Sequence, residues 1–170
     1  MNKKIIYYIV CKKCNKLVDI IDEDSDKIDT IPVMIREGCY IKSSATLRFT
    51  ITNKACLCRD IDSNRLRDII ASKLRSDREL YAFFSNWSPK LNQRLELLKR
   101  CLKTEFTAAV LIASRLCHEE EEELFLLEHI NSEKLLKTLL GIPLSSDKAS
   151  RVLVDKLNEI EKKKENTSNG

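Results

Sequence analysis

The pattern of hydrophobic and polar residues changes its period near residue 60. Before this point, β-branched and aromatic residues gather in the short runs 4–10 and 17–21, which are typical of strands. The polar stretch 11–15 between them predicts a tight turn. The chain is therefore expected to begin with two strands joined by this turn.

Two further strands are expected before residue 60. The segment 31–35 is rich in β-branched residues and would carry Pro32 at its edge. Over 40–52, apolar residues alternate with polar ones, which is typical of a half-buried strand. The apolar face of that strand would hold Leu47, Phe49 and Ile51. The first sixty residues thus predict a small β-rich module.

From residue 62 onward, the apolar residues recur at helical spacings of three and four. The first predicted helix would be capped by Asp62 or Ser63, and later ones by Thr104 and Ser132, because their side chains can accept from free backbone N–H groups. The pattern predicts six or seven short helices. They would pack as a compact bundle or as a run of HEAT-like pairs.

These patterns predict an α+β fold class with two modules. A β-rich module over 1–60 would be followed by an all-helical bundle over 61–164. The polar residues 165–170 are expected to form a disordered tail.

Composition narrows the class of protein. Of 170 residues, only 3 are glycine and 3 are proline, so few tight turns are available for an all-β fold. The net charge of +4 is uneven: residues 59–103 carry 11 basic and 6 acidic groups, whereas residues 104–137 carry 3 and 8. Such blocks predict either solvated helix faces, or a basic surface for nucleic acid beside an acidic surface for a basic partner.

The chain contains no segment suited to a membrane. No stretch approaches the about 20 apolar residues that cross a bilayer, so we expect no membrane partner. The apolar run that follows Lys3 and Lys4 is too short for a signal peptide. We expect an intracellular protein, nuclear or cytosolic, whose thiols stay reduced.

Cysteines give the strongest chemical signal. Among 7 cysteines, Cys11 and Cys14 form a C-x-x-C pair, and Cys56 and Cys58 form a C-x-C pair, each at the edge of a predicted strand. Four thiolates at about 2.3 Å from one Zn²⁺ make a closed structural site. A clamp between the first and last strands would stabilise a module whose own core is small. We therefore predict a small zinc-stabilised β-rich module.

Other roles for the cysteines are also considered. Cys39 is an alternative ligand in place of one member of the distal pair. The main alternative to a metal site is a set of buried, reduced cysteines that act as small hydrophobes. A redox pair of Cys11 and Cys14 is disfavoured, because no βαβ pattern surrounds them. Cys101 and Cys117 lie among leucines, and we expect both in the helical core.

The first cysteine pair resembles a known zinc-binding element. The sequence Val10-Cys11-Lys12-Lys13-Cys14, followed by Leu17-Val18, is similar to the opening of Yippee-type zinc-binding β folds. The resemblance implies a second C-x-x-C that closes the site across a strand-rich stretch. This chain has Cys56-Leu57-Cys58 instead and lacks the following glycine of that family. The resemblance is confined to this first pair and assigns the chain to no family.

Residues suited to catalysis are scarce. The 2 histidines, His118 and His129, have no nucleophile or second ligand at a useful spacing, and no phosphate-binding loop motif occurs. The glutamates 119–123 would lie all round a helix rather than form an acid/base pair. We expect no enzymatic activity and no small-molecule substrate. At helical spacing, the aromatic residues are expected in the core rather than as a partner anchor: Tyr81, Phe83, Phe84 and Trp87.

Two functions fit these observations. The favoured one is an adaptor or scaffold subunit of a nuclear or cytosolic complex, which binds other protein subunits through its helical module. The alternative is a nucleic-acid-binding transcription or replication accessory factor, which uses the zinc knuckle and the basic segment 59–103. Its phosphate contacts would be Lys12, Lys13, Arg65, Arg67, Arg75 and Arg78.

Overall fold

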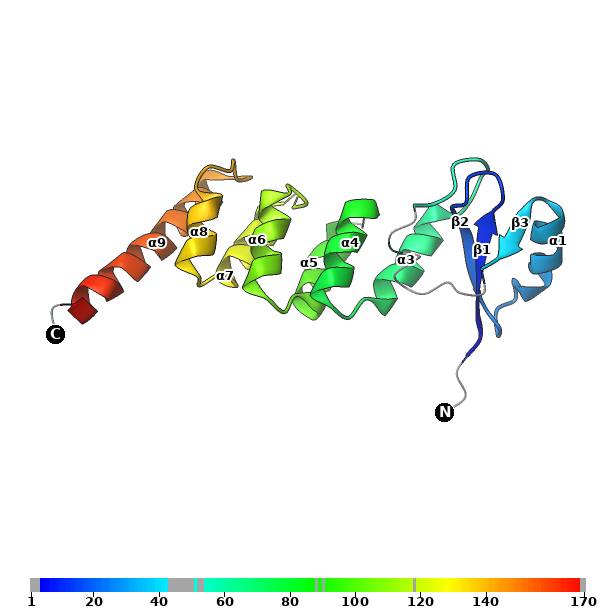
Figure 1. Cartoon of the computed structure of the whole chain (residues 1–170), viewed down its shortest axis with the longest axis horizontal. Coiled ribbons are helices and arrows are strands. Elements are labelled where there is room, and N and C mark those ends of the chain that lie inside the picture. Colours follow the sequence, from blue (N-terminus) through cyan, green and yellow to red (C-terminus); the bar gives the residue numbers. More distant parts are fainter. Residues whose placement is uncertain are drawn as a thin grey trace. The chain divides into compact units, whose positions relative to one another are not determined.

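A computed structural model describes residues 4–42, 51, 54–87, 89, 91–117 and 119–168. Within these residues the chain forms a three-stranded antiparallel sheet and eight α-helices, so it is a mixed α+β protein (Figure 1). It divides into two compact units. The N-terminal unit comprises Met1–Leu74 and Ala82–Pro89, and the helical unit comprises Arg75–Tyr81 and Lys90–Gly170.

The sheet is built on the predicted hairpin. Strand β1 (Ile6–Cys11) pairs antiparallel with β2 (Leu17–Asp22), and the short β3 (Cys39–Ile41) pairs antiparallel with the other side of β1. In the turn between β1 and β2, Asn15 has a φ of 57°, a left-handed conformation that asparagine tolerates. The first two predicted strands are therefore confirmed.

The segment 31–35 is helical, so the strand predicted there is wrong. The 3₁₀-helix η1 (Ile28–Thr30) leads into α1 (Ile31–Arg36), which holds Pro32 in its first turn. Proline is tolerated there because the missing N–H would have no partner in that turn. The helical spacing places three apolar side chains against the core of the N-terminal unit: Ile28, Ile31 and Met34.

Strand β3 covers only the beginning of the strand expected over 40–52. Gly38 precedes it with a φ of 93°, which favours glycine, and turns the chain from α1 into β3. Residues 43–50 and 52–53, with Leu47 and Phe49, lie outside the described residues. Ile51 is buried and has a helical backbone rather than the expected extended one.

Helix α3 (Ser63–Lys73) belongs to the N-terminal unit and packs on β2. The Asp62 side chain caps it by accepting from the N–H of Arg65 at 3.0 Å, as one of the two predicted caps. The guanidinium of Arg65 pairs with Asp19 and donates to the carbonyl oxygen of Ile20 at 3.0 Å. The N-terminal unit therefore extends past residue 60, where the sequence period changes.

Six more helices follow α3 in the described part of the chain. Together with α3 they make seven, which agrees with the six or seven helices predicted from residue 62 onward. The division between the units falls within the first of the six. They are α4 (Asp77–Asn86), α5 (Leu91–Cys101), α6 (Glu105–Ala113), α7 (Glu120–Glu128), α8 (Glu133–Leu139) and α9 (Asp147–Ser168).

Neighbouring helices of the helical unit pack as stacked pairs (Figure 1). Helix α6 contacts both α7 and α8, and α9 contacts both α7 and α8. The predicted caps are confirmed: the side chain of Thr104 accepts from the N–H of Thr107 at 3.2 Å, and that of Ser132 from Leu135 at 3.5 Å. Helices that are next but one in sequence contact each other, α5 with α7, α6 with α8 and α7 with α9, as in helical repeats.

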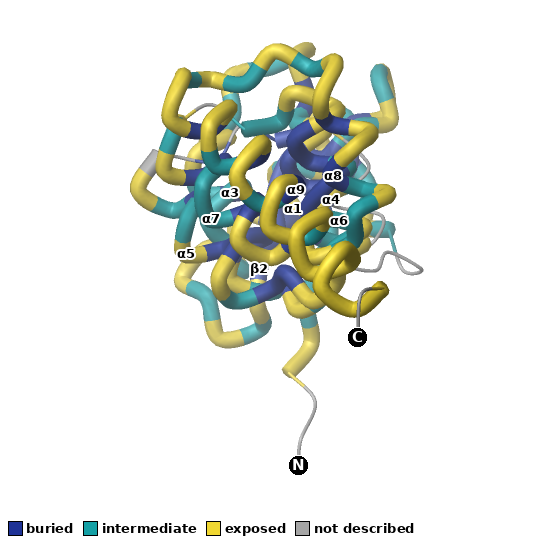
Figure 2. The backbone as a smooth tube through the Cα atoms, turned by 90° about the vertical axis from the view of Figure 1, so that its left-hand side faces the viewer, coloured by how far each residue is buried: buried dark blue, intermediate teal, exposed yellow. Residues whose placement is uncertain are grey.

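The last helix is longer than the sequence pattern predicts. Helix α9 has 22 residues and continues to Ser168, so most of the segment 165–170, expected to be disordered, is helical. Its last buried side chain is Leu157, and residues 161–168 are exposed. Figure 2 shows this exposed end of the tube leading to the C-terminus.

Candidate metal centre

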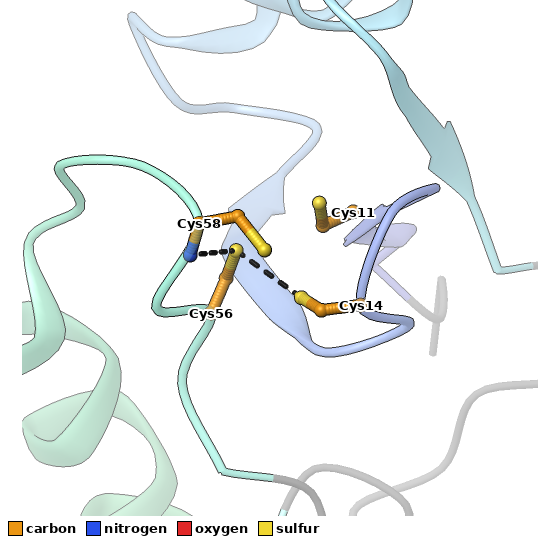
Figure 3. Close-up of side chains that lie close together, drawn as sticks. All are labelled: Cys11, Cys14, Cys56 and Cys58. Carbon is orange, nitrogen blue, oxygen red and sulfur yellow. Dashed lines mark hydrogen bonds between the residues drawn. The ribbon is translucent and has the colours of Figure 1, made fainter.

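Four cysteine sulfurs gather in the N-terminal unit. The Sγ atoms of Cys11, Cys14, Cys56 and Cys58 lie within 4.8 Å of one another (Figure 3). Four sulfurs at about 2.3 Å from a tetrahedral metal would stand about 3.8 Å apart, so the group is close to the required size. The structure thus brings together the four predicted ligands, although Cys14 and Cys56 are 42 positions apart in the chain.

The first two cysteines are positioned by the hairpin. Cys11 ends β1, and Cys14 lies in the turn that follows. This turn is closed by bonds from the N–H of Asn15 to the oxygen of Cys11, 2.8 Å, and from the N–H of Cys11 to the oxygen of Lys16, 3.0 Å. The backbone N–H groups of Cys14 and Lys13 also stabilise the Cys11 thiolate and lower its pKa to about 6. The turn therefore favours the ionised form that a metal binds.

The second pair is fixed to the same hairpin by backbone contacts. The N–H of Cys56 donates to the oxygen of Leu17 at 2.8 Å, and Leu17 forms an isolated parallel bridge with Ala55. The N–H of Cys58 donates to the Cys56 sulfur at 3.3 Å. Burial raises the pKa of Cys56 to about 12, so this thiol would need a nearby cation to ionise at neutral pH.

One arginine lies against the cluster, and two lysines belong to the turn that carries its first two cysteines. The Arg59 Nη2 lies 3.9 Å from the Cys11 sulfur and also donates to the carbonyl oxygen of Glu37 at 3.1 Å. Lys12 and Lys13 are exposed in the turn between the first two cysteines. Four thiolates around one divalent cation carry a net charge of about −2, which these groups partly balance.

The four cysteines differ in exposure. Cys11 and Cys56 are buried, Cys14 is half-buried, and Cys58 is exposed beside Leu57, which is 87% exposed. Cys39 lies opposite Cys11 in the β1–β3 ladder and is buried in the core of the unit. The cluster of four sulfurs does not include it. In the helical unit, Cys101 is buried, whereas Cys117 is half-buried.

The predicted nucleic-acid contacts fall into different surroundings. Arg65 is half-buried and paired with Asp19, and Arg67 lies 3.4 Å from Asp68. Arg75 and Arg78 are exposed, but they belong to the helical unit. In the N-terminal unit, the exposed members of the predicted set are the two lysines of the hairpin turn. Because Arg65 pairs with Asp19 of β2, its side chain serves to pack α3 on the sheet.

Most of the aromatic residues that were predicted in the core are buried, and one of the two histidines contacts a phenylalanine. Phe83, Phe84 and Trp87 are buried as predicted, whereas Tyr81 is 38% exposed. The His129 ring contacts the Phe125 ring in a tilted arrangement with centroids 4.4 Å apart, and its Nδ1 lies 2.9 Å from the Phe125 carbonyl oxygen. His118 lies outside the described residues.

Sequence reasoning missed a buried polar group in the helical unit. Arg94 donates from Nε to Oε1 of Glu122 at 2.6 Å, and each residue is only 2% exposed. Glu123 is also buried and accepts from the backbone N–H of Ser145 at 2.7 Å. The spacing held a signal, because Arg94 lies three, four and seven positions before the buried Leu97, Leu98 and Cys101.

Comparison of the chain with models of protein families, with curated proteins and with solved structures found no match. Among the residues that the structure describes, every helix is too short or too polar to span a bilayer.

Proposed function

We propose that the chain is a non-enzymatic adaptor or scaffold subunit whose N-terminal unit is held together by one structural Zn²⁺. The observation that carries the proposal is the cluster of four cysteine sulfurs within 4.8 Å of one another. Thiolates are soft ligands, and an all-sulfur tetrahedral set selects zinc or iron. A four-ligand protein shell leaves no open position for a substrate, which favours a structural role.

The helical unit supports the adaptor role. Its helices stack in pairs, an arrangement that presents extended surfaces for protein partners. Some of its apolar side chains are exposed, Phe106 by 66% and Val154 by 45%. Seven free cysteines suit a reducing compartment, so we place the protein in the cytosol or nucleus.

The first test is the metal content of the protein purified without added metal, measured by mass spectrometry. We expect about one zinc per chain in the wild type, and its loss in Cys11→Ser and Cys58→Ser. Cys39→Ser is the matched control, since this cysteine is buried in the same unit but lies outside the cluster.

Each alternative has its own result. Retention of zinc in Cys58→Ser with loss in Cys39→Ser would assign the fourth ligand to Cys39. Iron in place of zinc would correct the metal, and a stable protein without metal would contradict the structural site. Nucleic-acid binding would instead appear as affinity for a DNA duplex that falls steeply with salt.

A further inference from the structure

We propose that Cys11 and Cys39 form a reversible disulfide when a peroxide oxidises the metal centre, and that this bond removes Cys11 from the zinc. Cys39 is buried in the N-terminal unit but lies outside the cluster of four sulfurs. The effect of the disulfide on the metal rests on the proposed zinc site, whereas the disulfide itself follows from the geometry of the sheet.

The β1–β3 ladder places Cys11 and Cys39 directly opposite each other. The next pair along the ladder is hydrogen-bonded, because the N–H of Lys12 donates to the carbonyl oxygen of Gly38 at 2.9 Å. The backbone N–H and carbonyl groups of Cys11 both bond within the β1–β2 turn instead. Since hydrogen-bonded and non-hydrogen-bonded pairs alternate along an antiparallel ladder, Cys11 and Cys39 are a non-hydrogen-bonded pair.

A non-hydrogen-bonded pair has the spacing that a disulfide needs. Its Cα atoms stand about 4.5 Å apart, within the range of about 4.4–6.8 Å that disulfides span. Directly opposite side chains also lie on the same face of a sheet. Cys11 and Cys39 accordingly belong to the same buried cluster. The bond therefore requires rotation of two side chains but no change in the pairing of the strands.

A cation lies beside this pair. Nη2 of Arg59 is 3.9 Å from the sulfur of Cys11 and 3.1 Å from the carbonyl oxygen of Glu37, which is two positions before Cys39. In disulfide exchange, negative charge is carried by the sulfur that attacks and by the sulfur that leaves. A neighbouring guanidinium stabilises this charge, so Arg59 favours exchange at Cys11.

The exposed Cys58 gives an oxidant access to the buried pair. All 7 cysteines lie in the described residues, and Cys58 is the exposed one among them, whereas Cys11 and Cys39 are both 0% exposed. The sulfurs of Cys58 and Cys11 lie within 4.8 Å of each other. A peroxide therefore reacts first at Cys58, and Cys11 is close enough to react with the product.

The oxidation proceeds in three steps. The thiolate of Cys58 attacks one oxygen of hydrogen peroxide, which gives a sulfenic acid and hydroxide. The thiolate of Cys11 attacks the Cys58 sulfur and displaces a second hydroxide, which forms a first disulfide. Cys39 gives its proton to a hydroxide, attacks the Cys11 sulfur and expels Cys58 as a thiolate. In total, Cys11 and Cys39 lose two electrons to the peroxide, which becomes water and hydroxide.

The final disulfide changes the number of metal ligands. It regains the thiolate of Cys58 but withdraws that of Cys11, so three cysteines remain for a metal that structural sites bind with four ligands. Zinc is then bound more weakly and is released. Reduction of the disulfide restores the fourth ligand, which makes the loss reversible. Transient disulfides of this kind serve redox sensing in reducing compartments.

The experiment treats the full, zinc-loaded chain with hydrogen peroxide, blocks free thiols with N-ethylmaleimide and maps the disulfides by mass spectrometry. We expect a peptide linked through Cys11 and Cys39, and release of about one zinc per chain to a chromogenic chelator. Dithiothreitol with added zinc should remove the link and restore the zinc content. Dimedone, which traps sulfenic acids, should label Cys58 at early times.

Two variants isolate the role of Cys39. Cys39→Ser and Cys39→Val should hold zinc like the wild type before oxidation, because residue 39 lies outside the cluster. Circular dichroism checks that both variants fold. After peroxide, their oxidation should stop at the first disulfide, so that a link between Cys11 and Cys58 replaces the link to residue 39. Cys101→Ala, in the helical unit, is the control and should match the wild type.

The outcomes separate this disulfide from the zinc site. Wild-type links confined to the four clustered cysteines would overturn the role of Cys39 and leave the zinc site standing. A wild type that keeps its zinc and forms no link would do the same. A chain that holds no zinc before peroxide would contradict the zinc site, and the linked peptide would then decide the disulfide alone.

Discussion

Arg94 and Glu122 form an ion pair inside the helical unit, with Nε of Arg94 donating to Oε1 of Glu122 at 2.6 Å. The same guanidinium donates through Nη2 to the carbonyl oxygen of Leu116. Arg94 thus joins α5 to α7 and to the connection between α6 and α7. Because both side chains are shielded from water, each charge depends on the other for its stabilisation.

Removal of either partner should destabilise the helical unit strongly. Arg94→Leu leaves a buried carboxylate without its cation, and Glu122→Leu leaves a buried guanidinium without its anion. We expect each single change to lower the free energy of unfolding by about 3–5 kcal/mol. Urea unfolding followed by circular dichroism measures this loss.

The double variant Arg94→Leu/Glu122→Leu is the informative comparison. It leaves no unpaired charge and should recover much of the stability lost in the single variants. Lys137→Ala breaks an exposed pair with Glu133 and should change stability little. If Arg94→Leu is as mild as Lys137→Ala, the buried pair does not form in solution.

Local sequence signals predicted the elements that depend on neighbouring residues. The hairpin follows from two β-branched runs around a polar turn, and Thr104 and Ser132 cap the helices that they precede. The four cysteines could be grouped because two short pairs flank the predicted strands. In each case the residues that form the turn, the cap or the cysteine pair are only a few positions apart in the sequence.

Two features could not be predicted so directly, because they depend on tertiary packing. Ile31 and Val33 have high strand propensity, yet the segment is helical because Ile28, Ile31 and Met34 pack against the core on one side. Arg94 has the spacing of a core residue, but arginine is rarely fully buried unless its charge is paired. Its partner Glu122 comes from a run of five glutamates in which only the fold distinguishes buried from exposed positions.

Cys117 should make the stability of the helical unit depend on alkaline pH. Burial, with help from Glu122 and Glu123, raises the pKa of this thiol from 9.0 to about 12. The unfolded thiol therefore ionises at lower pH than the folded one. Its contribution to stability is complete below about pH 9 and is lost as the pH rises toward 12, with about 1 kcal/mol lost by pH 10.

Cys117→Val, which cannot ionise, isolates this effect. Between neutral pH and about pH 10, the free energy of unfolding of the wild type should fall relative to that of this variant. Chemical denaturation at both pH values measures it. A difference that stays constant with pH would show that the folded thiol ionises as easily as the unfolded one.

Arg65 should act on stability rather than as a surface contact. Asp19 is only 6% exposed and also accepts from the N–H of Ile20 at 2.8 Å. Arg65→Ala removes the closer of its two cationic partners, since Lys27 lies 3.9 Å away. We expect a loss of about 1–3 kcal/mol in the free energy of unfolding of the N-terminal unit. Arg36→Ala, at an exposed position in the last turn of α1, is the control and should change the stability little; equal effects of the two changes would contradict the packing role.

Zinc removal should unfold the N-terminal unit and spare the helical unit. Cys11 and Cys56 belong to the same buried cluster as Ile9, Val18 and Ile21, so loss of the metal would also loosen this core. Hydrogen exchange read by mass spectrometry, with and without a chelator, measures the effect along the chain. We expect faster exchange at 6–22 and 54–58, and unchanged exchange at 105–113 and 147–157, because the units have separate cores. Equal acceleration in both units would show that they unfold together, and no change in either would contradict a structural metal.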